Sequence, residues 1–381
     1  MPADVRDLNL PSVVAVVRNS DRLAAFDEML KAGQFFETLE AVRQKVGKSK
    51  EDFLIALKPN FMMTIRVEDP PVVYTDPVLV ERWIAKLAEA GYPRLCVVEA
   101  QNVYSLWYRN RSVNHVARVI GLEGHGYEVH DLTNEQFPFD YGGILGAHFV
   151  GETWRDADFR ISFAKNKTHD VSRCTLVLKN TYGCLPAKDK FTEYHRKREV
   201  DECTIQALKH FPIHFGAIDA TWSLDGPLGY KEGFDVLEDA DGNLICEGNI
   251  HRTETVIGGR DFLAVEHTGM TKMGLDPQKD TRFYKLAKDA FGERPFVVVG
   301  DRTLYDGWLN VGSEAADALD IGEEIPVMSH FLGESMAHVS PVLFPPRRNT
   351  WVRKLMHRVG RWFFLKKMRS RKGVRVLGPQ A

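Results

Sequence analysis

Residues 158–195 read DFRISFAKNKTHDVSRCTLVLKNTYGCLPAKDKFTEYH, and they join a strand-like run to a segment rich in lysine and histidine. The run at 158–163 is apolar enough for a buried strand, and KNKTH at 165–169 follows it almost at once. Residues 165–195 gather cations and imidazoles around very few acids, whereas a solvated helix face mixes charges of both signs. A site for phosphate or carboxylate needs convergent donors of this kind. We therefore expect the segment to bind an anion, with a basic surface loop as the alternative.

Strand and helix patterns alternate on both sides of this stretch. Short apolar runs are typical of buried strands, and the segments between them have helical spacing of apolar residues. Strand candidates lie at 12–17, 53–57, 95–99, 127–132, 158–163, 213–219, 244–251 and 296–299. Helix candidates lie at 21–46 with a break at Gly33, and at 76–90, 113–120, 175–180, 200–211 and 279–291. The alternation predicts an α/β fold with a mainly parallel sheet flanked by helices and with inserted α+β elements.

Length and composition are those of an ordinary soluble globular protein, with 381 residues of which 44% are hydrophobic and 27% charged. We expect residues 1–346 to form one α/β body, or two lobes with a boundary near 135–160, and residues 347–381 to form a separate tail. No apolar stretch approaches the roughly 20 residues of a membrane-spanning helix, and the N-terminal residues lack the pattern of a signal peptide. The expected location is the cytoplasm, with peripheral attachment at the inner face of the membrane through the tail.

The tail differs from the body in its charge. Residues 347–375 contain 12 basic and no acidic residues, which leaves 38 basic and 52 acidic residues in the rest of the chain. As a helix, residues 349–369 would carry tryptophans and aliphatic side chains on one side and basic side chains opposite. A C-terminal basic amphipathic helix of this kind suits the surface of an anionic bilayer. The alternative is that the helix docks its apolar side on the acidic body.

The number and spacing of the cysteines argue against metal sites and disulfide bonds. There are five of them, an odd number, and no C-x-x-C pair occurs. This pattern argues against a disulfide framework, a structural zinc site or an iron–sulfur cluster. We interpret the cysteines as small buried apolar residues, with Cys174 or Cys184 as a thiolate nucleophile in the alternative interpretation.

Polar side chains follow several of the strand candidates. Lys58 and Asn60 come after the second strand, Glu99 ends the third, and Asp219 ends a later one with Asp225 in the turn beyond it. In open α/β sheets ligands bind beyond the carboxyl ends of the strands. We therefore expect the first three residues to contact a ligand, and the aspartates to act as a general base or to orient a lysine or histidine. The alternatives are that Lys58, just before a proline, begins a surface turn and that Glu99 acts as a cap or pairs with a neighbour. For the aspartates the alternative is turn formation alone.

In their order along the chain, these residues resemble the family described as domain of unknown function 362 (DUF362). The shared landmarks are Lys58-Pro59-Asn60, Lys167-Thr168-His169, Thr175-Leu176, Lys179-Asn180, Gly183, Pro186, His195, Asp219, Asp225-Gly226-Pro227, Asp261 and Gly274-Leu275-Asp276-Pro277. Two features depart from the family. The cysteine-rich ferredoxin-like segment of many relatives is absent, so no iron–sulfur cluster is expected, and Glu266 stands where relatives more often have aspartate. The resemblance implies a fold and the location of a site more than a reaction.

The order of histidine, glycine, lysine and a second histidine is also similar to that in nickel-dependent lactate racemases, in which two histidines exchange protons with a hydroxy acid. A cationic pocket that holds a carboxylate stabilises a carbanion next to it. An imidazole with an ordinary pKa of about 6.5 is suited to moving that proton near neutral pH.

The leading hypothesis is an enzyme that moves protons on a small anionic metabolite bearing a carboxylate or a phosphate, with isomerase- or lyase-like chemistry. The catalytic candidates are His169, His195, Asp219 and Asp225. The ligand-binding candidates are Lys58, Asn60, Glu99, Lys167, Lys179, Asn180 and Lys190. The residues indicate no particular cofactor.

Two other hypotheses belong to different classes of protein. A metal site could be formed by His169, His195 and Asp219, although neither H-x-H nor H-E-x-x-H occurs in the chain. A non-catalytic, membrane-associated binding protein would use residues 347–375 as its functional element. Nucleic acid is not an expected partner, because the body is acidic and no recognised binding module is visible.

Overall fold

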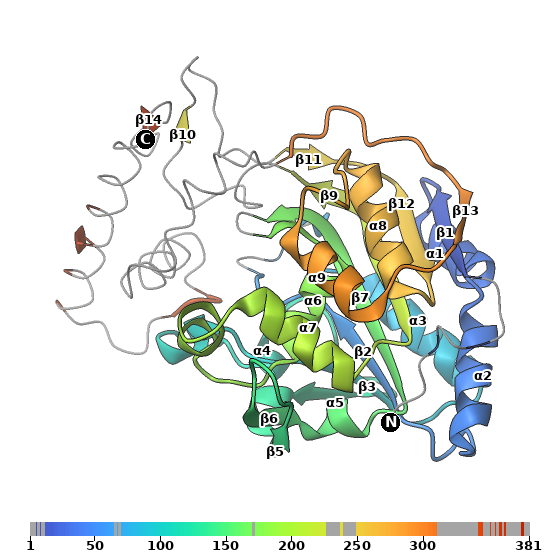
Figure 1. Cartoon of the computed structure of the whole chain (residues 1–381), viewed down its shortest axis with the longest axis horizontal. Helices are drawn as coiled ribbons and strands as arrows, with labels where there is room; N and C mark the ends of the chain where they lie inside the picture. The colour runs from blue at the N-terminus through green and yellow to red at the C-terminus, as the bar shows by residue number, and fades with distance from the viewer. Residues whose placement is uncertain are drawn as a thin grey trace.

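A mostly parallel sheet lies at the centre of the computed structural model, which describes residues 12–64, 70–169, 172–225, 249–310 and 342–345 and a few single positions outside them. Within the described residues the sheet has ten strands, and its main path runs β13-β1-β12-β9-β7-β2-β3-β4 (Figure 1). The strands on this path are β13 (Val297–Gly300), β1 (Val13–Arg18), β12 (Thr255–Gly259), β9 (Phe215–Leu224), β7 (Phe159–His169), β2 (Ile55–Pro59), β3 (Leu95–Glu99) and β4 (Glu128–Asp131). Only β12 is antiparallel to its neighbours on the path, so the predicted mainly parallel sheet is confirmed.

Helices cover both faces of this sheet and bury two separate hydrophobic cores. The helices on one face are α1 (Arg22–Ala32), α2 (Phe35–Val46), α3 (Pro77–Glu89) and α4 (Val113–Val119). Those on the other face are α6 (Val177–Thr181), α7 (Val200–His210), α8 (Phe262–Lys272) and α9 (Arg282–Phe291). Figure 1 shows α7, α8 and α9 on the near side of the sheet. Alternate residues of β2 point to the two layers: Ile55 and Leu57 belong to the first core and Ala56 to the second.

Local sequence explains where the first helices begin and end. The Asp21 carboxylate accepts hydrogen bonds from the backbone N–H groups of Leu23 and Ala24 at 2.9 and 3.2 Å, which caps α1. The helical segment is interrupted at Gly33. A Cβ at this position would lie 2.8 Å from the carbonyl oxygen of Met29. The predicted interruption of a helical segment at Gly33 is therefore confirmed, because α1 ends at Ala32 and α2 begins at Phe35.

The segment after residue 163 differs from its prediction as a loop followed by a helix. Strand β7 continues to His169, and the chain then turns back as β8 (Arg173–Thr175), which pairs antiparallel with β7. Helix α6 begins only at Val177. The polar run can continue a central strand because neighbouring strands supply partners for its side chains, as described below.

Several elements have no counterpart in the sequence prediction. The region 135–160 holds a hairpin of β5 (Gln136–Asp140) and β6 (Ala147–Gly151), followed by α5 (Glu152–Asp156), after which the chain enters the middle of the main sheet as β7. Strand β12 and helix α8 were also not predicted from the sequence. Most side chains of α8 are buried, so this helix lacks the amphipathic period that reveals a surface helix. Of the strand expected at 244–251, only β11 (Ile250–His251), which pairs with β9, lies within the described residues.

Most of the expected tail helix lies outside the described residues. The described positions Trp351, Leu355, Val359 and Trp362 are helical, with exposed fractions of 75%, 48%, 38% and 56%. No helix in the described part of the chain is both long enough and apolar enough to cross a bilayer.

Candidate functional site

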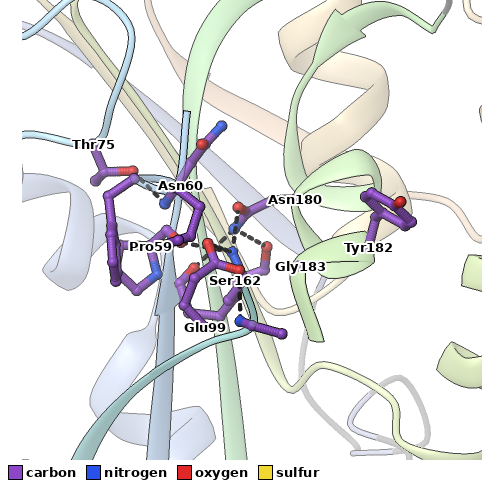
Figure 2. Close-up of polar contacts among 12 residues, drawn as sticks. Pro59, Asn60, Thr75, Glu99, Ser162, Asn180, Tyr182 and Gly183 are labelled. Atoms are coloured by element: carbon purple, nitrogen blue, oxygen red, sulfur yellow. Dashed lines mark hydrogen bonds and ion pairs between the residues drawn. The ribbon is translucent and has the colours of Figure 1, made fainter. Parts of the chain in front are cut away.

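Lys58 and Glu99 form a buried ion pair at the carboxyl ends of β2 and β3. The Lys58 Nζ atom lies 2.7 Å from Glu99 Oε2, and the two side chains are 1% and 4% exposed. Nζ also donates to the carbonyl oxygen of Pro59 at 2.7 Å and to Asn180 Oδ1 at 3.0 Å (Figure 2). An ammonium group has three donors, and these three bonds use all of them. Lys58 was predicted to contact a ligand, and in this structure its three donors contact protein groups.

Asn180 connects α6 to the sheet beneath it. Its Nδ2 donates to the carbonyl oxygen of Lys58 at 2.8 Å and to Ser162 Oγ at 3.0 Å, and Ser162 Oγ in turn donates to the carbonyl oxygen of Val177 at 3.0 Å. The amide therefore joins β2, β7 and α6 through both of its polar atoms. This network explains why a lysine–asparagine pair follows the apolar run at 176–178: the apolar side chains enter the core and Asn180 meets the strand ends.

Gly183 fits against the ion pair because it has no side chain. A Cβ at this position would lie 2.3 Å from Glu99 Oε1, 2.3 Å from Lys58 Cε and 2.6 Å from Lys58 Nζ. The Gly183 carbonyl oxygen also accepts the backbone N–H of Ala100 at 3.0 Å, and the same N–H lies 3.0 Å from Glu99 Oε1. Gly183, named in the sequence only as a landmark of the family resemblance, therefore allows the backbone to approach two charged groups closely.

Three further cationic or ionisable side chains from the segment 165–195 lie close to the ring of Tyr182. The Lys179 and Lys190 Nζ atoms lie 4.2 and 5.0 Å from the centre of its ring, and the His195 ring centre lies 5.7 Å away. His195 belongs to a π-helical turn at Phe191–Arg196 and also stacks on the ring of Phe191. Three of the predicted residues are thus brought together around an aromatic ring that was not itself predicted.

Lys190 is a buried amine with a lowered pKa. It is 4% exposed, and its Nζ donates to the carbonyl oxygens of Gly183 and Tyr182 at 3.2 and 3.4 Å. Burial lowers the pKa of Lys190 to about 8; Glu99 raises it, and Lys58 and Lys179 lower it further. The charges of Lys58, Lys179 and Glu99 therefore all affect the protonation of the buried Lys190. An amine with this pKa exchanges protons near neutral pH.

Cys184 lies beside this group, but its environment argues against a nucleophilic role. Burial raises the pKa of the thiol to about 12, although Lys58 and Lys190 lower it. Burial likewise raises the pKa of Cys174. Both are protonated, buried thiols near neutral pH, in agreement with the interpretation of the cysteines as small core residues.

Asp219 lies in a second charged cluster, on the other face of the sheet. Its Oδ2 is 2.8 Å from the Nζ of Lys165, and both side chains are fully buried. The same oxygen accepts the backbone N–H of Asp76, and Oδ1 accepts the N–H and hydroxyl of Thr221. The Asp76 carboxylate pairs with Arg22 at 2.6 Å, while burial and then the neighbouring Asp219 raise the pKa of Asp76. Asp219 was predicted to act as a general base or to orient a lysine or histidine, and the side chain that it contacts is that of Lys165.

Asp225 does contact an imidazole, that of His251 rather than that of His169 or His195. Its Oδ2 lies 2.7 Å from His251 Nε2 and accepts the backbone N–H of Leu309 at 2.7 Å. Its Oδ1 accepts the N–H of Asn249 at 2.9 Å. These contacts join β9, β11 and the chain near residue 309, so Asp225 holds three segments together.

The remaining predicted residues lie elsewhere along β7 and β2. His169, at the end of β7, accepts the backbone N–H of Ser172 through Nδ1 at 3.2 Å. Lys167 is buried and stands opposite Thr175 in the β7–β8 pair. The Asn60 backbone N–H donates to Thr75 Oγ1 at 2.9 Å, and Figure 2 shows the Asn60 side chain pointing away from Glu99 and Asn180.

Glu266 is a buried carboxyl that the sequence did not identify as part of the site. It is 2% exposed, and its Oε2 accepts the backbone N–H of Leu178 at 2.9 Å in the first turn of α6. Burial raises its pKa to about 8, although hydrogen bonds from Leu178 and Val177 oppose the shift. The side chain thus caps the helix that carries Lys179 and Asn180.

The described residues include no group of three or more histidine, cysteine, aspartate or glutamate side chains that could hold a metal ion. The three residues of the alternative metal site, His169, His195 and Asp219, all belong to the described part of the chain. Both carboxylate oxygens of Asp219 accept hydrogen bonds from protein donors. These three residues therefore form no set of metal ligands in the described part of the chain.

Comparison with known proteins identifies a family but no reaction. A family model described as Domain of unknown function (DUF362) matches residues 55–271, more than half of the chain. No curated protein matches the sequence. Among solved structures, the lactate racemase apoprotein from Thermoanaerobacterium thermosaccharolyticum aligns with 70% of this chain and 59% of its own, at 11% identity and a TM-score of 0.36. A protein from Thermotoga maritima aligns with 62% of this chain and 58% of its own, at 13% identity and a TM-score of 0.32. This chain thus spans about three fifths of each of these structures.

Proposed function

This chain belongs to the DUF362 family, and from the geometry of its site we propose that it is an enzyme that moves a proton on a small anionic metabolite. The observation that carries the proposal is that Lys58, Lys179 and Lys190 are all buried and that Lys58 and Lys179 both lower the pKa of Lys190, while Glu99 is paired with Lys58. Burying like charges is unfavourable, so such an arrangement gains stability when an anion joins it. A carboxylate or phosphate group is an anion of suitable chemistry.

In this proposal the residues have distinct roles. Lys179 and His195, which flank the ring of Tyr182, contact the anion. Lys190 takes or gives the proton, because its lowered pKa supplies both protonation states near neutral pH. Lys58 is a positioning residue, since its donors are occupied, and its charge helps to keep the pKa of Lys190 low.

Proton transfer can be measured without knowledge of the physiological substrate. Lactate, malate and their phosphorylated analogues are incubated with the protein in D2O, and NMR follows the loss of the C–H signal next to the carboxylate. We expect exchange that Lys190→Met abolishes and Lys179→Ala weakens, while melting temperatures change little. Lys188→Ala is the matched control, because Lys188 is two residues away and exposed. Equal exchange in wild type and Lys190→Met would refute the role of Lys190.

A second candidate function, peripheral membrane binding, is favoured by the exposed tail side chains. On a helix, where successive residues turn by about 100°, positions 351, 355, 359 and 362 fall within one narrow sector. The apolar side chains at these positions are all exposed. With 12 basic and no acidic residues at 347–375, this face suits an anionic bilayer. Membrane attachment is compatible with catalysis by the body.

A further inference from the structure

Lys190 differs from three other buried lysines in what it contacts. Lys58, Lys165 and Lys272 each pair with a carboxylate at 2.7–2.9 Å, whereas Lys190 donates to two carbonyl oxygens. A carboxylate partner favours the ammonium form of lysine, which has no lone pair. A carbonyl oxygen accepts a hydrogen bond from a neutral amine as well, so the contacts of Lys190 are compatible with a nucleophilic nitrogen.

The surroundings of Lys190 also favour the neutral amine. The side chain is 4% exposed, and two further lysines, Lys58 and Lys179, lie close enough to oppose its charge. Burial beside other cations is the arrangement that activates lysines for attack on carbonyl groups. Lys58 cannot serve in this way because it is fully hydrogen-bonded to Glu99, Pro59 and Asn180. Lys179 lies closer to the ring of Tyr182 than Lys190 does, at 4.2 Å against 5.0 Å, so the ring favours the charged form of Lys179 more strongly.

We propose that Lys190 forms an imine with the carbonyl group of a small oxo acid. This inference rests on the proposed function and names the substrate class of the same site; with an oxo acid, Lys190 binds the substrate carbon covalently and does not itself carry the proton. The neutral Nζ adds to the carbonyl carbon, and a proton passes from nitrogen to the former carbonyl oxygen. The carbinolamine then takes up one proton from solvent and loses water, which leaves a protonated imine. No oxidant or reductant is consumed. The cationic imine then draws electrons from the adjacent C–H bond, which makes that proton easier to remove.

The carboxylate of the oxo acid would lie among the other cations of the cluster. Lys179 and His195 approach the same tyrosine ring as Lys190, so a carboxylate one carbon away from the imine would remain within their reach. Glu99 is paired with Lys58 at 2.7 Å, so the carboxylate of the oxo acid would bring a further negative charge to the lysines of the cluster. This arrangement selects a carbonyl compound with an acid group over a neutral aldehyde.

Reductive trapping tests the imine directly. Full-length protein is incubated with pyruvate, glyoxylate or neutral acetaldehyde and sodium cyanoborohydride near pH 7, digested, and analysed by peptide mass spectrometry. A pKa of about 8 gives Lys190 a neutral fraction roughly three hundredfold that of an ordinary lysine at this pH. We expect adducts on Lys190 to exceed those on the exposed Lys188 by at least about tenfold, and the two oxo acids to react better than acetaldehyde.

Two variants and one binding measurement complete the test. Lys190→Arg keeps the charge but cannot form an imine, and it should remove the adduct, whereas Lys188→Arg should leave it unchanged. The imine is overturned if neither oxo acid gives an adduct on Lys190, or if Lys188 reacts equally. Calorimetric titration with lactate, which has no carbonyl group to trap, separates the two proposals. If lactate binds but neither pyruvate nor glyoxylate forms an adduct, the imine alone is overturned. If lactate does not bind and no adduct forms, the proposed function is overturned as well.

Discussion

Replacing Gly183 by alanine places a methyl carbon inside the buried ion pair of Lys58 and Glu99. The new Cβ would lie 2.3 Å from Glu99 Oε1 and from Lys58 Cε, so each atom must move by about 1.1 Å to reach ordinary contact at 3.4 Å. Gly183 does not have a positive φ angle, so alanine adds no backbone strain. The cost arises from the contact alone.

The magnitude follows from two known effects. Overpacking a rigid interior costs about 1–3 kcal/mol, and separating a buried charge pair costs about 3–5 kcal/mol when one charge is left uncompensated. The ion pair is 2.7 Å long and a shift of this size weakens it without removing either charge. We therefore expect Gly183→Ala to lower the free energy of unfolding by about 3 kcal/mol.

Urea unfolding followed by circular dichroism measures this change, with an unaltered m-value expected because the folded surface stays the same. The matched control is the same substitution in a Lys58→Ala/Glu99→Ala background, which lacks the atoms that the methyl group would meet. There Gly183→Ala should cost less than about 0.5 kcal/mol. An equal loss in both backgrounds, or no loss in the wild type, would refute the described packing.

Three other perturbations give distinct results. Burial raises the pKa of Glu266 to about 8, so its carboxyl is protonated in the folded chain and ionised in the unfolded chain between about pH 5 and pH 8. The free energy of unfolding should fall as pH rises through this window, by at most about 1.4 kcal/mol per pH unit, and urea titrations of Glu266→Gln should show this slope reduced. Asp219→Asn leaves the buried ammonium of Lys165 without its carboxylate and should cost about 3–5 kcal/mol in urea unfolding; a loss below about 1 kcal/mol would contradict the described pair. A Trp351→Ser/Trp362→Ser variant should sediment with anionic vesicles roughly tenfold less than wild type, while undiminished sedimentation would exclude the tail face as the contact.

The alternation of strands and helices could be predicted from the sequence because it depends on local patterns of apolar residues. Apolar runs such as 53–57 and 95–99 mark buried strands, and the periodic segments between them mark helices. Helix α8 was missed for the same reason, since nearly all its faces are buried and no apolar stripe remains. The continuation of β7 through KNKTH was also missed, because a lysine in a central strand requires a partner that local sequence does not reveal.

The sequence by itself determined the fold class, the family resemblance and the neighbourhood of Lys58 and Glu99, because the carboxyl ends of adjacent parallel strands must meet at one edge of a sheet. Only the tertiary structure decided which of the charges meet. Lys58 pairs with Glu99 41 residues away and Lys165 with Asp219 54 residues away, on opposite faces of the sheet, while Lys179, Lys190 and His195 gather around Tyr182. A residue's charge is a local property, but its desolvation and its partner depend on strand order and side-chain direction, which only the assembled sheet defines.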